Sequence, residues 1–222
     1  MTYSDIVCGV FLRRLNRFVA EVDIGGELVR VHVRNTGRCT SVLVPGREVS
    51  LQKSADPGRT TQYTLIAVNT PGYGWVNLDS LAPNKLAGEW LRSRGFTQIK
   101  PEYGFGSSRV DFYAERNGER WLIEVKGCTL AKNGVAFFPD APTKRGTKHL
   151  RELSGAVPQG HRSMILFVIM LRGVTSVEPN SGVDPEFAAE YARAAAAGVL
   201  TGTVTCGCTE DSVSIVRSSA PL

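Results

Sequence analysis

The dipeptide Asn117-Gly118 constrains the fold of this 222-residue chain more than any other feature. It separates two runs rich in aromatic and β-branched residues, and Asn-Gly favours a two-residue hairpin turn because both turn residues take positive φ. If these two residues form the loop, Asp111 on the first strand faces Glu124 on the second. A three-residue loop that includes Glu119 is the alternative, and it would shift this register.

Alternation along the hairpin sorts its side chains into two faces. One face carries Asp111, Tyr113, Leu122, Glu124 and Lys126. The other face is wholly apolar and consists of Val110, Phe112, Ala114, Trp121, Ile123 and Val125. We expect the apolar face to be buried, so the hairpin belongs to a core sheet and holds the polar side chains on a rigid scaffold.

Two opposed carboxylates, with Cβ atoms about 4.5–5.5 Å apart, destabilise the strand pair unless something compensates. Asp111 and Glu124 would supply the oxygen ligands that suit Mg²⁺ or Mn²⁺. Lys126 would then orient the attacking water or neutralise charge on a phosphodiester, and Glu89, on a helix predicted to precede the hairpin, is a candidate fourth group. The alternative is a surface hairpin in which Lys126 forms a simple ion pair with Glu124.

Basic residues are concentrated in one part of the chain, although the formal net charge is only +5. Residues 126–162 carry seven basic and two acidic side chains, whereas residues 178–211 carry six acidic side chains and one basic. A basic stripe at helical spacing suits a phosphate backbone, because phosphate contacts release condensed counterions. A solvated helix face is the alternative. The residues expected to contact nucleic acid in this half of the chain are Arg109, Lys144, Arg145 and Lys148.

The first 82 residues favour a small β-barrel of the OB type. Six short β-prone runs separated by turns support this interpretation, at residues 6–12, 18–24, 28–33, 49–52, 63–69 and 75–78. The barrel also carries arginines that are candidates for nucleic-acid binding: Arg13, Arg14, Arg17, Arg34 and Arg38.

Residues 83–222 predict a second domain, a mixed sheet flanked by helices, so the chain as a whole belongs to the mixed α/β class. Helices are expected after Pro83, Thr143 and Asp184. Between them we expect a loop at 127–142 and a buried strand at 164–171, and two strands at 200–205 and 213–217 close the domain.

The composition is that of a folded globular protein, with 42% hydrophobic and 21% charged residues. The longest apolar run is about half the length that a membrane-spanning helix needs, and the first ten residues lack the pattern of a signal peptide. The five cysteines lack the Cys-x-x-Cys spacing of zinc sites and are expected to be reduced thiols. We therefore expect a cytoplasmic protein that does not bind a membrane.

Asp111 followed by Glu124-Val125-Lys126 resembles the PD-(D/E)xK nuclease signature. Longer strings resemble the sugar fermentation stimulation protein (SfsA) family of prokaryotes, at residues 31–38, 44–46, 82–84, 106–112, 124–126 and 138–150. The resemblance implies an OB-like barrel joined to a nuclease-like domain, with sequence-independent affinity for DNA. By position it implies that Asp111, Glu124 and the backbone carbonyl of Val125 bind the metal, and that Lys126 and Glu89 are catalytic.

Three functions are compatible with these residues. A metal-dependent nuclease acting on DNA or RNA is favoured, because an opposed acid pair repels nucleic acid unless a cation is present. A non-catalytic DNA-binding protein with a regulatory role is the alternative, and the family resemblance implies that this role would concern sugar metabolism. An RNA-processing factor would share the chemistry of the nuclease and differ in its substrate.

Overall fold

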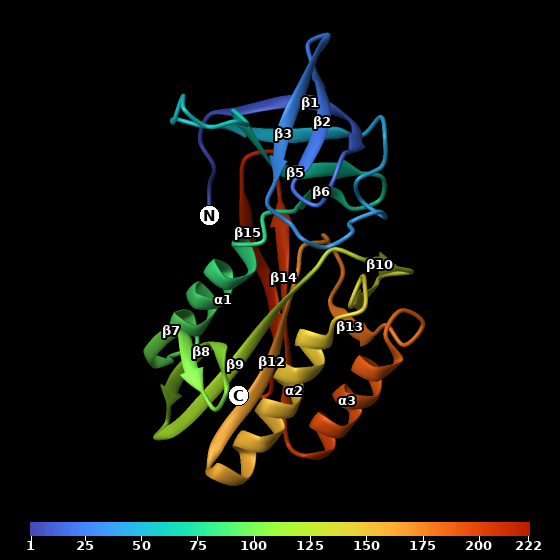
Figure 1. Ribbon diagram of the computed structural model, residues 1–222. Helices are drawn as coiled ribbons and strands as arrows, with labels where there is room; N and C mark the ends of the chain where they lie inside the picture. Colours follow the sequence, from blue (N-terminus) through green and yellow to red (C-terminus); the bar gives the residue numbers. More distant parts are fainter.

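The computed structural model describes residues 1–222 as a small β-barrel beside a larger layered domain (Figure 1). The barrel strands are β1 (Ile6–Arg14), β2 (Val19–Ile24), β3 (Glu27–Val33), β4 (Glu48–Lys53), β5 (Tyr63–Thr70) and β6 (Gly74–Asn77). They lie in the order β3-β2-β1-β4-β5-β6, and a parallel pairing of β3 with β5 closes the barrel. The predicted N-terminal barrel of the OB type is confirmed.

Local sequence signals explain the barrel. Gly25 and Gly26 take φ of +64° and +93° in the turn that joins β2 to β3, a conformation that glycine adopts without strain. Alternate residues of the strands point inward, and Phe11, Val31 and Leu65 are 2% exposed or less. This buried apolar interior holds the closed sheet together.

The second domain is built on a six-stranded mixed sheet in the order β15-β14-β12-β9-β8-β7. A small three-stranded sheet, β10-β11-β13, lies beside it. The elements in chain order are α1 (Ala82–Ser93), β7 (Thr97–Phe105), β8 (Ser108–Arg116), β9 (Glu119–Cys128), β10 (Ala131–Lys132), β11 (Val135–Phe138), α2 (Lys144–Ala156), the 3₁₀ helix η1 (Val157–Gln159), β12 (His161–Ile169), β13 (Ser176–Pro179), α3 (Pro185–Ala196), β14 (Leu200–Cys208) and β15 (Val213–Ser219).

Helices cover both faces of this sheet. Phe112 of β8 packs against Gly88 of α1, and Phe112 is paired with Ile123 of β9. Glu124, the next residue of β9, contacts His149 of α2. Because neighbouring strand residues point to opposite faces, α1 covers one face and α2 the other. α3 packs beside α2, as Figure 1 shows.

The hairpin between β8 and β9 has the predicted two-residue loop. Asn117 and Gly118 take φ of +53° and +80°, and Arg116 is paired with Glu119. The ladder between the two strands ends where Phe112 meets Ile123. The predicted register is therefore confirmed over the paired residues. The next position, Asp111, lies beyond the ladder.

Helix starts were predicted well, whereas some strands were missed. The side chain of Thr143 accepts a hydrogen bond from the N–H of Gly146 at the start of α2, and Asp184 accepts one from Phe187 at the start of α3. The segment expected to be a loop at 127–142 contains β10 and β11. The edge strand β7 was also missed, because it contains Pro101 and is largely exposed, without a regular apolar alternation.

All five cysteines are free. Burial raises the pKa of the Cys39 and Cys208 thiols to about 11, so these thiols are protonated and unreactive at neutral pH. No helix has the length and hydropathy required to cross a membrane.

The N-terminal residues tie the barrel to the second domain. The terminal amine of Met1 donates to the carbonyl of Val213 at 3.0 Å. The hydroxyl of Tyr3 donates to Oδ2 of Asp79 at 3.2 Å, and Arg34 of the barrel pairs with the same carboxylate. Asp79 is 2% exposed and lies just before α1, so this buried polar group anchors the barrel where the second domain begins.

Candidate metal-binding active site

Asp111 lies at the point where β8 leaves β9. Its Oδ2 accepts a hydrogen bond from the backbone N–H of Val125 at 2.7 Å, and its Oδ1 accepts one from Nδ2 of Asn84 on α1 at 2.9 Å. Because the N–H and C=O of one strand residue point to the same strand edge, the Val125 carbonyl faces the Asp111 side as well. The structure thus brings Asp111 and Val125 together. It adds Asn84, which sequence reasoning missed. The only available signal was the position of this polar residue in the first turn of the predicted helix.

Glu124 is 2% exposed and lies on the face of β9 that α2 covers. Its Oε1 accepts hydrogen bonds from Nζ of Lys126 at 2.5 Å and from Nδ1 of His149. Its Oε2 is buried and has no partner. The ion pair expected for a surface hairpin does form between Lys126 and Glu124. It is a buried pair, however, with side chains 14% and 2% exposed.

His149 is a second residue that sequence reasoning did not place at the site. Its Nε2 accepts a hydrogen bond from Nε of Arg145 at 3.3 Å. Because an acceptor nitrogen carries no proton, the ring proton is on Nδ1, which donates it to Glu124. The sequence did contain a signal for His149, because this polar residue precedes Leu150 on the side of the predicted helix that is buried. Arg145, His149 and Glu124 form a chain of contacts that leads from the surface to the acid pair.

The two acids of the pair have opposite pKa shifts. Burial raises the pKa of Asp111 above its ordinary value, and the charge of Glu124 raises it further, against the charge of Lys126. Burial also tends to raise the pKa of Glu124. The hydrogen bond from His149 and the charge of Lys126 outweigh burial, so the pKa of Glu124 is lowered. The surroundings thus favour the neutral form of Asp111 and the charged form of Glu124.

The donor set fits a hard divalent cation such as Mg²⁺ or Mn²⁺. The residues that would hold it are Asp111, Glu124 through its unpartnered Oε2, and Val125 through its carbonyl. No group of three or more His, Cys, Asp and Glu side chains in the structure is arranged to enclose a metal ion. Two carboxylates leave positions for water and phosphate, which is how Mg²⁺ is usually bound in phosphoryl-transfer sites.

Glu89 does not join this acid pair, contrary to expectation. It is exposed and lines a cavity of about 440 Å³ between α1 and β15. Asp111 and Glu124 lie on β8 and β9, toward the other edge of the sheet. Successive helix residues are rotated by about 100°, so the side of α1 that reaches Asp111 through Asn84 is not the side that carries Glu89.

Several cations predicted to bind nucleic acid have partners within the protein. Arg13 pairs with Glu21 at 2.6 Å, and Arg34 pairs with Asp79 at 3.3 Å. Lys148 lies 3.6 Å from Glu152. Arg14 donates to five backbone carbonyls and Arg145 donates to His149, so both have structural contacts. Arg151, which follows Lys148 by three residues on α2, is paired with Glu186 and Glu190 of α3.

The remaining predicted cations are free. Their side chains are exposed and form no hydrogen bond or ion pair: Arg17, Arg38, Arg109 and Lys144. Arg109 lies two residues before Asp111 on β8, and Lys144 is the first residue of α2. These four cations are the positions from which a bound polyanion would displace only counterions.

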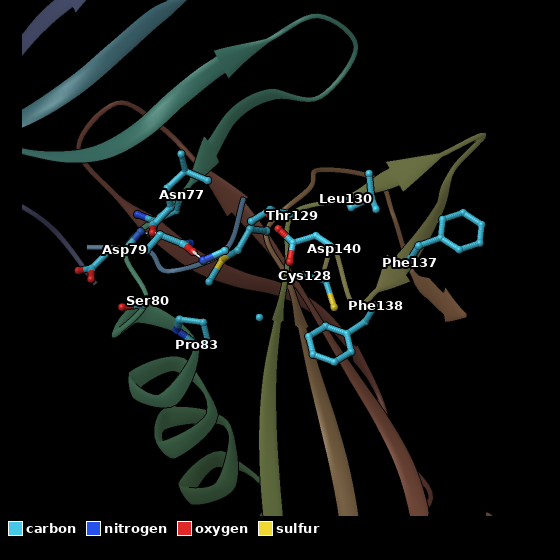
Figure 2. A pocket seen from close by; sticks show the side chains of 15 residues that line it. Asn77, Asp79, Ser80, Pro83, Cys128, Thr129, Leu130, Phe137, Phe138 and Asp140 are labelled. Atoms are coloured by element: carbon cyan, nitrogen blue, oxygen red, sulfur yellow. Dashed lines mark hydrogen bonds between the residues drawn. The ribbon is translucent and has the colours of Figure 1, made fainter. Parts of the chain in front are cut away.

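A cavity of about 160 Å³ lies between the barrel and the second domain (Figure 2). Asp79 lines it from the barrel side and Asp140 from the side of the second domain. Oδ2 of Asp140 accepts a hydrogen bond from the N–H of Cys39 at 3.3 Å. Gly127, which follows Lys126, also lines this cavity. A Cβ atom at position 127 would lie 2.8 Å from Cγ of Pro83. This close approach sets the start of α1 beside the acid pair.

Comparisons with known proteins agree on one family. Residues 12–78 match the family model described as SfsA N-terminal OB domain, and residues 81–212 match the sugar fermentation stimulation protein RE domain. The chain is 42% identical over 219 residues to a sugar fermentation stimulation protein homolog of Clostridium beijerinckii, covering 97% of this chain and 96% of the relative. It is 44% identical over 216 residues to a homolog of Desulfitobacterium hafniense, covering 96% and 94%.

A solved structure gives the same result. The structure of Pyrococcus furiosus SfsA in complex with Ca²⁺ matches with a TM-score of 0.84 and 29% identity, over 98% of this chain and 96% of that chain. The agreement therefore extends through both the barrel and the layered domain. On these grounds the chain belongs to the SfsA family of sugar fermentation stimulation proteins.

Proposed function

We propose that this protein is a metal-dependent nuclease that hydrolyses phosphodiester bonds of DNA or RNA and uses Mg²⁺ or Mn²⁺. The observation that carries the proposal is the environment of Glu124. One of its oxygens is held by Lys126 and His149, while the other is buried without a partner, and the charge of Glu124 raises the pKa of Asp111. A surface that only binds nucleic acid gains nothing from a buried acid pair, because carboxylates repel phosphates.

The residues around the proposed metal site would have different roles in the reaction. When bound, the cation would polarise the phosphodiester, lower the pKa of a water molecule and offset the repulsion between the acids. Asn84 holds Asp111 and His149 holds Glu124, so the ligand oxygens are oriented before the substrate arrives. The side chain of Lys126 is 14% exposed, so its Nζ can be reached from solvent. There it would orient the water or neutralise charge on the phosphate oxygens.

The related protein of known structure supports the metal part of the proposal. Pyrococcus furiosus SfsA was solved in complex with Ca²⁺. Ca²⁺ and Mg²⁺ are both hard cations that take oxygen ligands, and Asp111, Glu124 and Val125 offer only oxygen atoms. We infer that a divalent cation binds to these three residues in this chain.

The distribution of free cations supports nucleic acid as the partner. Arg109 and Lys144 are exposed and unpaired on elements that carry or adjoin the acid pair, and Arg17 and Arg38 are exposed and unpaired on the barrel. We infer that these four residues contact the phosphate backbone of DNA or RNA. Such contacts carry little base specificity, in line with binding that is largely independent of sequence.

The test is a cleavage panel with labelled single-stranded, double-stranded and branched DNA and with RNA, in Mg²⁺ or Mn²⁺. Wild type should cleave at least one substrate, and Asp111→Ala and Lys126→Ala should abolish cleavage while binding in EDTA persists. Glu89→Ala is the matched control, because this exposed acid lies away from the pair, and it should cleave at the wild-type rate.

Two outcomes would contradict the proposal. Cleavage at the wild-type rate by Asp111→Ala or Lys126→Ala would show that any activity resides elsewhere or in a contaminant. Binding without cleavage of any substrate by wild type would identify a non-catalytic DNA-binding protein, the regulatory alternative.

A further inference from the structure

Arg14 joins two loops at one end of the barrel. Its guanidinium donates hydrogen bonds to the carbonyls of Asn16 and Arg17, in the loop between β1 and β2. It also donates to the carbonyls of Asn35, Gly37 and Arg38, in the segment that follows β3. Because one planar group binds both segments, the backbones of Arg17 and Arg38 are held close together. Both of their side chains are exposed and unpaired.

A cleft of about 310 Å³ opens between these loops. The residues that line it are Arg14, Asn16, Arg17, Thr36, Gly37, Arg38 and Thr40, so no acidic and no hydrophobic residue takes part. Such a lining, rich in hydrogen-bond donors and positive charge, suits an anion. It is unsuited to an apolar ligand or a cation.

Phe18 follows Arg17 in the loop between β1 and β2, which supplies part of the lining of the cleft. Its side chain is 50% exposed, although aromatic rings normally contribute to a core. The backbone around it is fixed, because the N–H of Phe18 donates to Oδ1 of Asn16 at 2.8 Å and its carbonyl accepts from Val33 at 2.7 Å. The ring is therefore presented to solvent by an ordered loop.

We propose that Phe18, Arg17 and Arg38 form a binding site for single-stranded nucleic acid, in which the arginines contact successive phosphates and an unpaired base stacks on Phe18. An aromatic platform beside unpaired cations is the usual arrangement for binding single strands. Bases of a duplex are already stacked inside the helix, so Phe18 would add affinity for a single strand only. Like the proposed function, this inference takes nucleic acid as the ligand, but it does not require catalysis.

The position of the cleft agrees with delivery of a strand to the acid pair. Gly37 lines both this cleft and the cavity between the two domains. On its opposite side that cavity is lined by Gly127, the residue after Lys126. A strand held by the barrel would therefore pass along the domain junction to reach the candidate active site.

The test measures binding of the full-length protein to a fluorescent single strand of about 20 nucleotides, longer than one OB-fold site, and to its duplex, by anisotropy in EDTA so that no cleavage occurs. Phe18→Ala should weaken binding of the single strand by about 5- to 150-fold, as loss of one stacked base does, and should leave duplex binding unchanged. Phe18→Trp should restore single-strand affinity. Leu28→Ala is the matched control, because Leu28 is 64% exposed at the other end of the β2–β3 hairpin and should have no effect.

Salt dependence tests the arginines separately. Arg17→Gln and Arg38→Gln should each lower the slope of log K against log salt by about 0.7, the value for one phosphate contact with a single strand. Arg13→Gln is the control, because Arg13 is also exposed to solvent but already paired with Glu21. Its slope should equal that of wild type.

The outcomes separate this inference from the proposed function. An equal effect of Phe18→Ala on single strand and duplex, or no effect, would overturn the single-strand site even if the protein cleaves DNA normally. Loss of cleavage only in Asp111→Ala and Lys126→Ala, with single-strand binding still dependent on Phe18, would support both. Dependence of single-strand binding on Phe18 in a protein that cleaves nothing would support the binding site and overturn the nuclease.

Discussion

Replacement of His149 by phenylalanine tests how the acid pair is supported. His149 is 5% exposed, and its ring donates to Oε1 of Glu124 and accepts from Arg145. Phenylalanine has a ring of similar size without nitrogen atoms, so the packing of α2 on the sheet should be retained. The variant removes the hydrogen bond to Glu124 and leaves a buried carboxylate with one donor fewer.

The structure sets the expected magnitude. A hydrogen bond to a charged group contributes about 1.5–3 kcal/mol, so the free energy of unfolding in EDTA should fall by about that amount. Loss of a partner that orients a metal ligand typically lowers metal affinity about 10- to 100-fold. At about 1.36 kcal/mol for each factor of ten, that loss is about 1.4–2.7 kcal/mol, which is close to the predicted loss of stability.

Two measurements check this prediction. Urea unfolding in EDTA gives the change in stability, and calorimetric titration of the metal-free protein with Mn²⁺ gives the change in affinity. His149→Asn should recover part of both losses, because its amide is a donor that can replace Nδ1. His161→Phe is the control, since this ring packs on Phe105 at the start of β12 and does not contact the acid pair.

The result that would refute the reasoning is specific. If His149→Phe binds Mn²⁺ with wild-type affinity, His149 does not orient Glu124 for the metal, and a loss of stability alone would show that its hydrogen bond only stabilises the fold. If wild type itself binds no Mn²⁺ or Mg²⁺, the metal site as a whole is wrong.

Three further predictions concern single contacts elsewhere in the second domain and at the acid pair. Glu190→Gln should lower the free energy of unfolding by about 1–2 kcal/mol at pH 7, because Glu190 accepts hydrogen bonds from two arginines that include Arg151 of α2. These arginines lower the pKa of Glu190 in the folded state. The contribution is therefore complete above the unfolded pKa of about 4.3 and lost as the pH falls through the folded pKa; urea unfolding of variant and wild type should converge once the pH is below the folded pKa. Gly127→Ala should destabilise the protein by about 1–3 kcal/mol in thermal unfolding, because its Cβ would lie 2.8 Å from Cγ of Pro83; an unchanged melting temperature would show that α1 shifts freely. In Asp111→Asn, Mn²⁺ should no longer raise the melting temperature, because one ligand oxygen and its charge are lost, whereas an equal Mn²⁺ effect on both proteins would place the cation elsewhere.

The features that sequence reasoning predicted correctly depend on short-range chemistry. Asn117-Gly118 determines the hairpin loop, because its residues take positive φ whatever surrounds them. Thr143 and Asp184 cap helices through bonds to residues three positions along the chain. The register from Arg116 and Glu119 to Phe112 and Ile123 follows from the turn, whereas the opposition of Asp111 and Glu124 lies beyond these pairs and stays a prediction.

The residues that sequence reasoning placed wrongly depend on which side of a helix meets the sheet. Glu89 and Asn84 are both polar residues of α1, and packing decides that Asn84 reaches Asp111 while Glu89 faces β15. The helix that carries His149 was considered only for its exposed cations. His149 lies on the buried side of this helix and contacts Glu124. Periodicity defines such a face, but it does not say which strand the face will cover.

The sequence by itself therefore determined the barrel, the mixed α/β domain and the loop of the β8–β9 hairpin, since each arises from turns, caps and alternation within a few residues. Only the tertiary structure decided which polar groups support the pair and which arginines are free. Arg14 and Arg17 look alike in the chain, yet Arg14 binds five carbonyls while Arg17 stays exposed. The partners of Arg14 include residues more than 20 positions away, and such long-range pairing forms only when the closed barrel brings the two loops together.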